Sequence, residues 1–265
     1  MSRITIILPI HEVNDELKSF YRQAIGSIPI SDEGKALYPV IVVGPKKVIE
    51  TYKDEKLEKI VDIEYLPNTK SGFQDQINAA AKACKTDYFS ILEIDDMYNH
   101  NWFKNVEEHI DTLPGVSFFL PLTEVFDVSE GGKPVPVGFA NEIALTTSFS
   151  DKIGYIGEDE LMEYSDFNAT GGVFKTSDFL SIGGLKPKLK IVFWYEFLLR
   201  AAHNHKEAYV IPKLGYKHNL RRKGSLMEIV SSTIDDKEAE FWYDTARHDY
   251  FFNKEREDTY YTYEK

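Results

Sequence analysis

The sequence predicts an α/β fold with a mainly parallel central sheet flanked by helices and a C-terminal helical extension. Strand and helix signals alternate through the first hundred residues, which is typical of βαβ units. The strand segments are short and apolar on both faces, as expected beneath two helix layers. Three carboxylates, Glu93, Asp95 and Asp96, follow the apolar run 88–92 directly. Such a strand would deliver them to its carboxyl end, where open α/β sheets bind ligands.

Apolar runs and amphipathic stretches define the elements of the first half. Its predicted strands are residues 4–8, 40–43, 61–66 and 88–92, and its predicted helices are residues 12–25, 46–58 and 72–84. The small-residue face of the last helix includes Cys84, the only cysteine, which we interpret as structural. A single cysteine excludes an intramolecular disulfide and a thiolate metal cage.

The sequence of the second half predicts further strands that extend the sheet with mixed direction. Its predicted elements are strands at 117–122 and 125–128, a Gly-rich turn at 130–133, a hairpin partner at 135–139, a helix at 177–182 closed by Gly183 and Gly184, a helix at 191–203, a strand at 208–211, a basic loop around 213–223, and helix from 226 onward. On the helix 191–203, Glu196 and Arg200 stand at i and i+4 and are able to pair.

Composition narrows the class of protein. A chain of 265 residues with 43% hydrophobic residues predicts a globular protein. The net charge of −12 argues against a nucleic-acid binder, although Arg221, Arg222 and Lys223 form a local basic cluster able to face a diphosphate. The apolar run after Met1 is too short for a signal peptide, and no segment approaches membrane-spanning length. We therefore expect a cytoplasmic protein.

The acidic run is the strongest functional signal. Packed carboxylates repel one another unless a cation joins them, and oxygen ligands suit Mg²⁺ or Mn²⁺ that also holds a phosphate. Glu93, Asp95 and Asp96 therefore predict a metal-diphosphate site. The alternative is a solvated acidic turn that caps the following helix.

Several short motifs occur in a defined order along the chain. They are Pro9, Ile10 and Glu12 after the first strand, Asn68, Gly72 and Asn78 before the acidic run, Glu93-Ile94-Asp95-Asp96 at the end of a strand, and Gly171-Gly172 followed by the helix ending at Arg200. In that order, residues 4–225 resemble family 2 glycosyltransferases with the A-type nucleotide-sugar-binding fold. Fold analogy alone does not prove chemistry, so the roles must be argued at the site.

The resemblance implies a role for each motif. A UDP- or GDP-sugar donor would lie against Pro9, Ile10 and Glu12, with Glu93 near its ribose. Asn68, Gly72 and Asn78 would belong to the same donor site, and Asp95 with Asp96 would hold Mn²⁺ or Mg²⁺ on the diphosphate. His218 would be a further metal ligand or diphosphate contact, although lone histidines usually have other duties.

The catalytic base departs from the family pattern. Family members often carry Glu-Asp at the start of the helix that ends here at Arg200, whereas this chain has Phe193 and Trp194. Glu196 is the nearest carboxylate, and burial beside aromatic residues would raise its pKa. Its other interpretation is a salt bridge with Arg200, and Asp166 on the preceding loop is a weaker substitute.

Two further departures concern the donor. Val43, Gly44 and Pro45 stand where family members commonly place acidic residues that contact the base or ribose. Glu93 replaces the commoner first aspartate, which keeps the charge and lengthens the arm.

Three functions remain open. The first is a metal-dependent, inverting glycosyltransferase of hexosyltransferase type, which passes a sugar from a nucleotide donor to a hydroxyl acceptor such as a glycan. The second is a non-catalytic relative that binds a nucleotide sugar, glycan or protein, which the missing Glu-Asp pair favours. The third is a nucleotidyltransferase, which the lack of a Gly-rich basic phosphate loop after Leu8 disfavours.

The resemblance also suggests a domain organisation. Residues 1–225 would form the glycosyltransferase-like domain, with residues 1–100 as the nucleotide-binding half and 101–225 as the acceptor half. Residues 226–265 would form a helical extension rich in aromatic residues. We interpret these aromatic residues as helix docking or homodimer packing, ahead of stacking on sugar rings.

Overall fold

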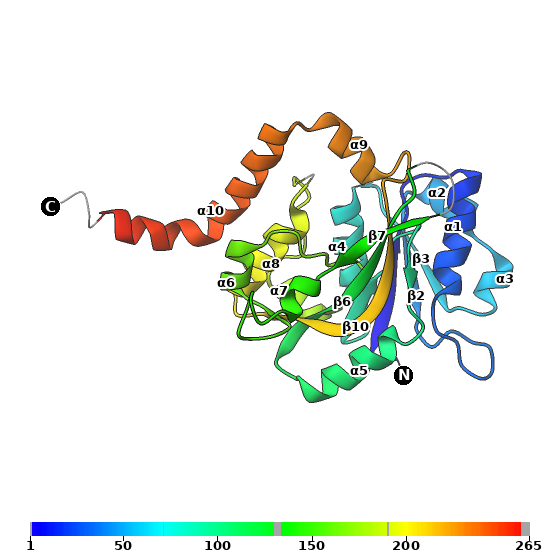
Figure 1. The fold of residues 1–265 in the computed structure, drawn as a ribbon. Helices are drawn as coiled ribbons and strands as arrows, with labels where there is room; N and C mark the ends of the chain where they lie inside the picture. The colour runs from blue at the N-terminus through cyan, green and yellow to red at the C-terminus, as the bar shows by residue number, and fades with distance from the viewer. Residues whose placement is uncertain (1, 71, 130–133, 190, 261–265) are drawn as a thin grey trace.

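One mixed sheet runs through the chain, with helices on both of its faces (Figure 1). The computed structural model describes residues 2–70, 72–129, 134–189 and 191–260. Its strands are β1 (Ile4–Pro9), β2 (Val40–Gly44), β3 (Ile63–Pro67), β4 (Tyr88–Ile91), β5 (Met97–Tyr98), β6 (Val116–Asp127), β7 (Val135–Ala140), β8 (Tyr155–Ile156), β9 (Val173–Lys175) and β10 (Glu207–Leu220). The predicted α/β fold class is confirmed.

The strand order brings the ends of distant strands to one edge. Along the sheet the order is β3-β2-β1-β4-β9-β6-β10-β5, with β7 beside β6 and β8 beside β10. Strands β3, β2, β1 and β4 are parallel, as predicted, and β6 and β10 are also parallel to each other. Between them, β9 is antiparallel to both β4 and β6. Consequently β4 and β10 run in the same direction, and their carboxyl ends lie at the same edge of the sheet.

Helices cover the two faces and create two apolar cores. The helices are α1 (Asp15–Gly26), α2 (Lys46–Tyr52), α3 (Glu55–Glu58), α4 (Phe73–Ala83), α5 (Trp102–Thr112), α6 (Glu158–Glu163), α7 (Thr176–Ser181), α8 (Phe193–His203), α9 (Leu226–Thr233) and α10 (Asp236–Tyr260), with the 3-10 turn η1 (Glu142–Leu145). Buried residues of α1 and α5 pack in one core, and those of α4, α7 and α8 pack in the other. Among the described residues, no helix is long and apolar enough to cross a bilayer.

Local chemistry explains where the elements begin and end. Asn14 caps α1, because its side chain accepts a hydrogen bond from the Leu17 amide at 2.8 Å. The predicted helix 46–58 is instead two helices, because Asp54 caps α3 by accepting from the Lys56 amide. Beyond α9, the helix α10 leads away from the sheet (Figure 1).

The second half differs most from the prediction. The two strands predicted at 117–122 and 125–128 form the single strand β6, and β10 continues through most of the predicted basic loop. Strands β6 and β10 pair along most of their length, with register shifts around Leu214. Pro212, which lacks an amide proton, lies at that irregularity. The hairpin partner at 135–139 is confirmed as β7, while the predicted turn 130–133 lies outside the described residues.

Gly215 on β10 provides a test of this packing. A Cβ atom at this position would overlap the indole ring of Trp102 and also meet Pro121. Because both neighbours are buried, we expect Gly215→Ala to lower the free energy of unfolding by about 1–3 kcal/mol in urea titrations. Gly26→Ala is the matched control, since its Cβ would meet nothing within 4 Å. The control should be neutral or slightly stabilising, and an equal loss in both variants would contradict the packing argument.

Candidate active site

The acidic run after β4 meets the end of β10. Because the two strands run in the same direction, residues 93–96 lie beside residues 216–222 although more than 120 positions separate them. The amide of Glu93 donates to the hydroxyl oxygen of Tyr216 at 3.0 Å, and the side chain of Asn219 donates to the carbonyl of Asp95. These contacts fix the acidic turn against β10.

Buried Asp96 pairs with His218, which is partly exposed. The Nδ1 atom of His218 lies 2.7 Å from Oδ2 of Asp96, and the Asn219 amide donates to Oδ1 at 2.9 Å. Burial alone would lower the pKa of His218, but the charge and hydrogen bond of Asp96, with the charges of Glu93 and Asp95, raise it to about 9. Asp96 thus orients the imidazole. At neutral pH the ring carries a second proton on Nε2, so this atom would donate to an anion, or would release its proton to bind a metal ion.

Asp95 forms an ion pair with Arg222. The Nε atom of Arg222 donates to Oδ2 of Asp95 at 2.6 Å, and both residues are more than nine-tenths buried. Such a pair is a charge-assisted hydrogen bond with little access to water. Arg222 therefore neutralises Asp95 in this state.

Glu93 has a different environment from the two aspartates. The hydroxyl of Thr170 donates to its Oε1 atom at 3.1 Å. Burial, and then the neighbouring charge of Asp96, raises the pKa of Glu93 to about 7. Near neutral pH this carboxyl group is therefore able to hold or accept a proton.

A cavity of about 190 Å³ opens beside these residues, and we call it the rim pocket. It is lined by Pro9, His11, Phe73, Glu93, Ile94, Asp95, Phe193, His218, Asn219, Leu220, Arg221, Arg222 and Ser225. The structure thus brings together four of the residues predicted from sequence, Pro9, Glu93, Asp95 and His218. Asp96 is 1% exposed and lies behind His218.

The donor atoms fit a divalent cation that also binds substrate. Among the described residues, no three His, Cys, Asp or Glu side chains are grouped as a complete metal site. A carboxylate from Asp95 and an imidazole from His218 are nevertheless suitable for Mn²⁺, and Mg²⁺ commonly takes one or two carboxylates with phosphate oxygens from a substrate. Arg222 would have to leave Oδ2 of Asp95 to admit the cation.

Two residues predicted for the donor site, Ile10 and Glu12, lie outside the rim-pocket lining. Ile10 is fully buried, and its carbonyl accepts from the side chain of Gln76 at 3.0 Å. A Cβ on Gly44 would collide with the carbonyl and side chain of Ile10, so this position does not accept a side chain in the observed packing. The Glu12 carbonyl accepts from the hydroxyl of Tyr52 at 2.9 Å.

Three other predicted residues hold backbone in place. The side chain of Asn68 donates to the carbonyl of Asp75 at 3.2 Å, and Gly72 is the N-cap of α4. Asn78 joins α4 to the loop before α8, because its amide group donates to the carbonyl of Leu185 and accepts from its amide. In this structure these contacts are structural.

The two predicted base residues lie outside the rim-pocket lining. Glu196 is 1% exposed and pairs with Arg200 at 2.9 Å, with Lys186 at 2.9 Å and with the hydroxyl of Tyr250 at 2.6 Å. The expected rise of its pKa is wrong. Burial alone would raise the pKa, but the hydrogen bond and charge of Arg200, with Tyr250 and Lys186, lower it below the ordinary value. Asp166 is exposed and accepts from the hydroxyl of Tyr243 at 3.3 Å.

Sequence reasoning missed several residues of this site. Arg222 was recognised only as part of a basic cluster able to face a diphosphate, and its pairing with Asp95 spans 127 positions. Thr170 and Tyr216 carry no local signal, because each reaches Glu93 through the strand order of the sheet. Such contacts become visible only when the topology is known.

Comparisons with known proteins bear on the family and the fold of this chain. Residues 44–139 match the family described as "Glycosyl transferase family 2". The sequence matches no curated protein. Among solved structures, S. aureus TarS 1-349 in complex with UDP-GlcNAc is similar, with 14% identity and a TM-score of 0.61 over 86% of this chain and 61% of that chain. The chain therefore spans about three fifths of that relative's length.

A second structure comes from a different organism. The mannosyltransferase PcManGT from Pyrobaculum calidifontis, in complex with GDP-Man and Mn²⁺, is 13% identical with a TM-score of 0.58, over 84% of this chain and 58% of that chain. At these identities the likeness establishes the fold, and the family match adds the sequence relationship. The predicted resemblance and the A-type fold are confirmed.

Proposed function

We propose that this family 2-like glycosyltransferase moves a sugar from a nucleotide-sugar donor to a hydroxyl acceptor at the rim pocket, with the help of Mn²⁺ or Mg²⁺. The observation that carries the proposal is the meeting of Glu93, Asp95 and His218 at the carboxyl edge of the sheet. The complexes of the similar proteins with UDP-GlcNAc and with GDP-Man and Mn²⁺ support it.

The roles of the residues follow from their surroundings. We assign the cation to Asp95 and His218, with Asp96 orienting the imidazole. The family resemblance assigns the donor nucleotide to Pro9, Ile10 and Glu12, of which Pro9 lines the pocket. Asn68, Gly72 and Asn78 would shape the adjoining backbone. A bound cation would offset the charge that develops on the departing nucleoside diphosphate. Arg222, once released from Asp95, would be able to contact the same diphosphate.

An inverting reaction needs one base within hydrogen-bond reach of the acceptor hydroxyl. Glu196 and Asp166 are the two candidates for this base, and neither lines the rim pocket. A base role for Glu196 requires the acceptor to approach from α8 and to disrupt its contacts with Arg200 and Tyr250. The effect of Glu196→Gln on catalysis and on stability separates a base from a structural residue.

Binding experiments test the proposed donor class. We expect UDP- or GDP-sugars with Mn²⁺ to raise the melting temperature of the full chain, because a ligand that binds the native state stabilises it. The screen compares each nucleotide sugar with and without Mn²⁺, and the free sugar serves as the control. A positive donor is then incubated with acceptors to detect nucleoside diphosphate release. If no nucleotide sugar shifts the melting temperature, the proposal is wrong.

A non-catalytic relative is the second candidate, because Phe193 and Trp194 stand where the Glu-Asp pair is common. Calorimetry distinguishes the two. Binding of UDP or GDP with Mn²⁺, together with neither hydrolysis nor transfer of any donor, would favour the non-catalytic function.

The two roles proposed for Asp96 predict different metal affinities. If Asp96 orients His218, Asp96→Asn should weaken Mn²⁺ binding about 10–100-fold, the usual effect of losing such a partner. Titration of Mn²⁺ in the presence of UDP, followed by electron paramagnetic resonance, measures the affinity. Loss of all binding would instead make Asp96 a direct ligand, and an unchanged affinity would exclude both roles.

We also propose the division of the chain into residues 1–225 as the transferase domain and 226–265 as a helical extension. The first part of α10 packs on α8 through Tyr243 and Tyr250, which favours helix docking as the role of those aromatic residues. The exposed ring of Phe241 remains available for a homodimer contact.

A further inference from the structure

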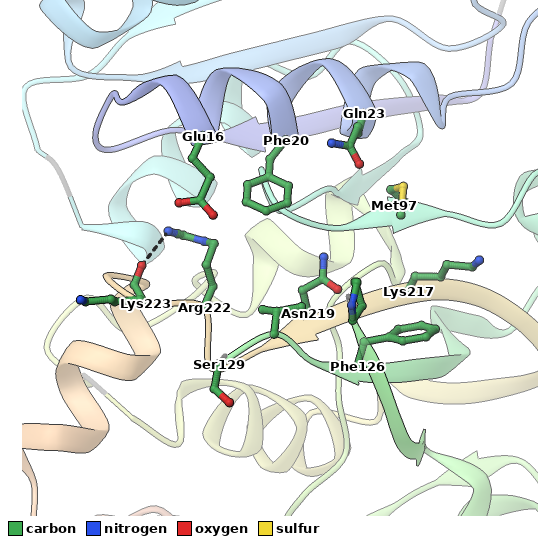
Figure 2. Close-up of a pocket in the computed structure, with 12 residues that line it drawn as sticks. Glu16, Phe20, Gln23, Met97, Phe126, Ser129, Lys217, Asn219, Arg222 and Lys223 are labelled. Carbon is green, nitrogen blue, oxygen red and sulfur yellow. Dashed lines mark hydrogen bonds between the residues drawn. The ribbon is translucent and has the colours of Figure 1, made fainter. Parts of the chain in front are cut away.

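A second and larger cavity lies on the other side of the end of β10. Its volume is about 730 Å³, within the range of pockets that bind small molecules. It is bounded by α1, β5 and the ends of β6 and β10, and we call it the α1 cavity. Figure 2 shows Phe20 extending from α1 into the space above Asn219 and beside Met97. Neither the acidic run after β4 nor the end of β1 lines it, so it adjoins the proposed donor site without sharing the carboxylates of that site.

One part of the α1 cavity is apolar. Phe20, Met97, Phe126 and Val128 contribute side chains from three different elements and are all partly exposed. Apolar surface of this kind is normally buried against a partner, because its contact with water is unfavourable. A ligand with an apolar body would remove that contact.

The other part of the cavity is cationic, which is unusual in a chain with a net charge of −12. Lys217, Arg222 and Lys223 line it together with the acid Glu16. Within the part of the chain that the structure describes, Lys217 and Lys223 form no ion pair, whereas Arg222 is held by Asp95. Lysine side chains beside the apolar part of the cavity suit a ligand that joins an anionic group to an apolar body.

We propose that the α1 cavity binds an anionic amphiphile, with its apolar chain against Phe20, Met97 and Phe126 and its phosphate or carboxylate group at Lys217. The proposal does not depend on sugar transfer. Asn219 and Arg222 line both the α1 cavity and the rim pocket, so the two ligands would be separated by these two side chains.

Binding of decyl phosphate below its micellar concentration tests the proposal on the full chain. We expect calorimetry to show saturable binding of decyl phosphate, at least tenfold tighter than that of inorganic phosphate, decyl maltoside or decyltrimethylammonium. The first comparison isolates the apolar chain, and the other two isolate the negative charge. Equal affinity for decyl phosphate and inorganic phosphate, or for decyl phosphate and the cationic analogue, would overturn the proposal.

Two lysine variants locate the site. Lys217→Gln should weaken decyl phosphate binding at least fivefold, whereas Lys213→Gln, an exposed residue of the same strand outside the cavity, should leave it unchanged. Both variants must unfold at the wild-type temperature, which shows that the change is local. Equal effects of the two variants would overturn the assignment. Displacement of decyl phosphate by UDP with Mn²⁺ would place it in the rim pocket and would also overturn the proposal.

Discussion

Replacing Asp95 with asparagine is expected to lower kcat/KM for sugar transfer about a thousandfold, because the cation on the diphosphate would lose its carboxylate. Lewis-acid stabilisation of a leaving group contributes several kcal/mol, and ~4 kcal/mol corresponds to a thousandfold in rate. Steady-state release of nucleoside diphosphate measures the effect. Retention of wild-type activity would exclude Asp95 from the metal site.

The control must separate chemistry from folding, since an uncharged asparagine in place of Asp95 would leave the charge of Arg222 buried without a full partner. The double variant Asp95→Asn, Arg222→Gln removes that charge and should recover stability without recovering activity. Asp127→Asn is the matched single variant, because Asp127 pairs with the neighbouring Arg221 at 2.7 Å near the surface. It should retain both activity and stability.

The acidic site was predictable because its signal is local. An apolar run followed by Glu93, Asp95 and Asp96 fixes both the strand and the end at which the carboxylates lie. The alternation of strands and helices fixed the parallel half of the sheet for the same reason. The helix predicted at residues 12–25 begins three residues before α1 (Asp15–Gly26), because the cap at Asn14 was not recognised from the sequence.

The partners of the acidic residues were not predictable in the same way. Asp96 meets His218 across 122 positions, and Asp95 meets Arg222 across 127, so no local pattern records either pair. The length of β10 depends on its pairing with β6, which overrides the Pro and Gly signals within it. At Glu196 the i, i+4 pair with Arg200 was visible in the sequence, whereas the contacts from Lys186 and Tyr250 were not.

Because of those additional contacts, we expect replacement of Glu196 to destabilise the protein strongly. We expect Glu196→Gln to lower the free energy of unfolding at pH 7 by about 3–5 kcal/mol, because it removes one partner of a buried ion pair and leaves Arg200 uncompensated. Urea unfolding measures the loss. Asp249→Asn is the control, because Asp249 contacts the same Lys186 at 3.5 Å but is exposed. Its effect should stay within about 0.5 kcal/mol.

The pH dependence of the stability loss in Glu196→Gln shows whether the charge of Glu196 causes that loss. The folded protein holds the pKa of Glu196 below its ordinary value of 4.5, so its contribution to stability is present above that pH and is lost as the pH falls through the lowered pKa. The stability difference between wild type and Glu196→Gln should therefore be constant from neutral pH to about pH 5 and shrink in more acidic solution.

The base hypothesis for Glu196 makes the opposite prediction. If Glu196 is the catalytic base, Glu196→Gln should lower kcat and leave the free energy of unfolding nearly unchanged. The pH profile of kcat should then lose the step that belongs to the base. The hydrogen bond from Tyr250 to Glu196 ties α10 to α8, and the pair with Arg200 lies within α8. Glu196 itself lies outside the rim-pocket lining, to which α8 contributes Phe193. We therefore expect Glu196→Gln to reduce activity only in proportion to the unfolded fraction, and a loss of kcat at full folding would restore the base role.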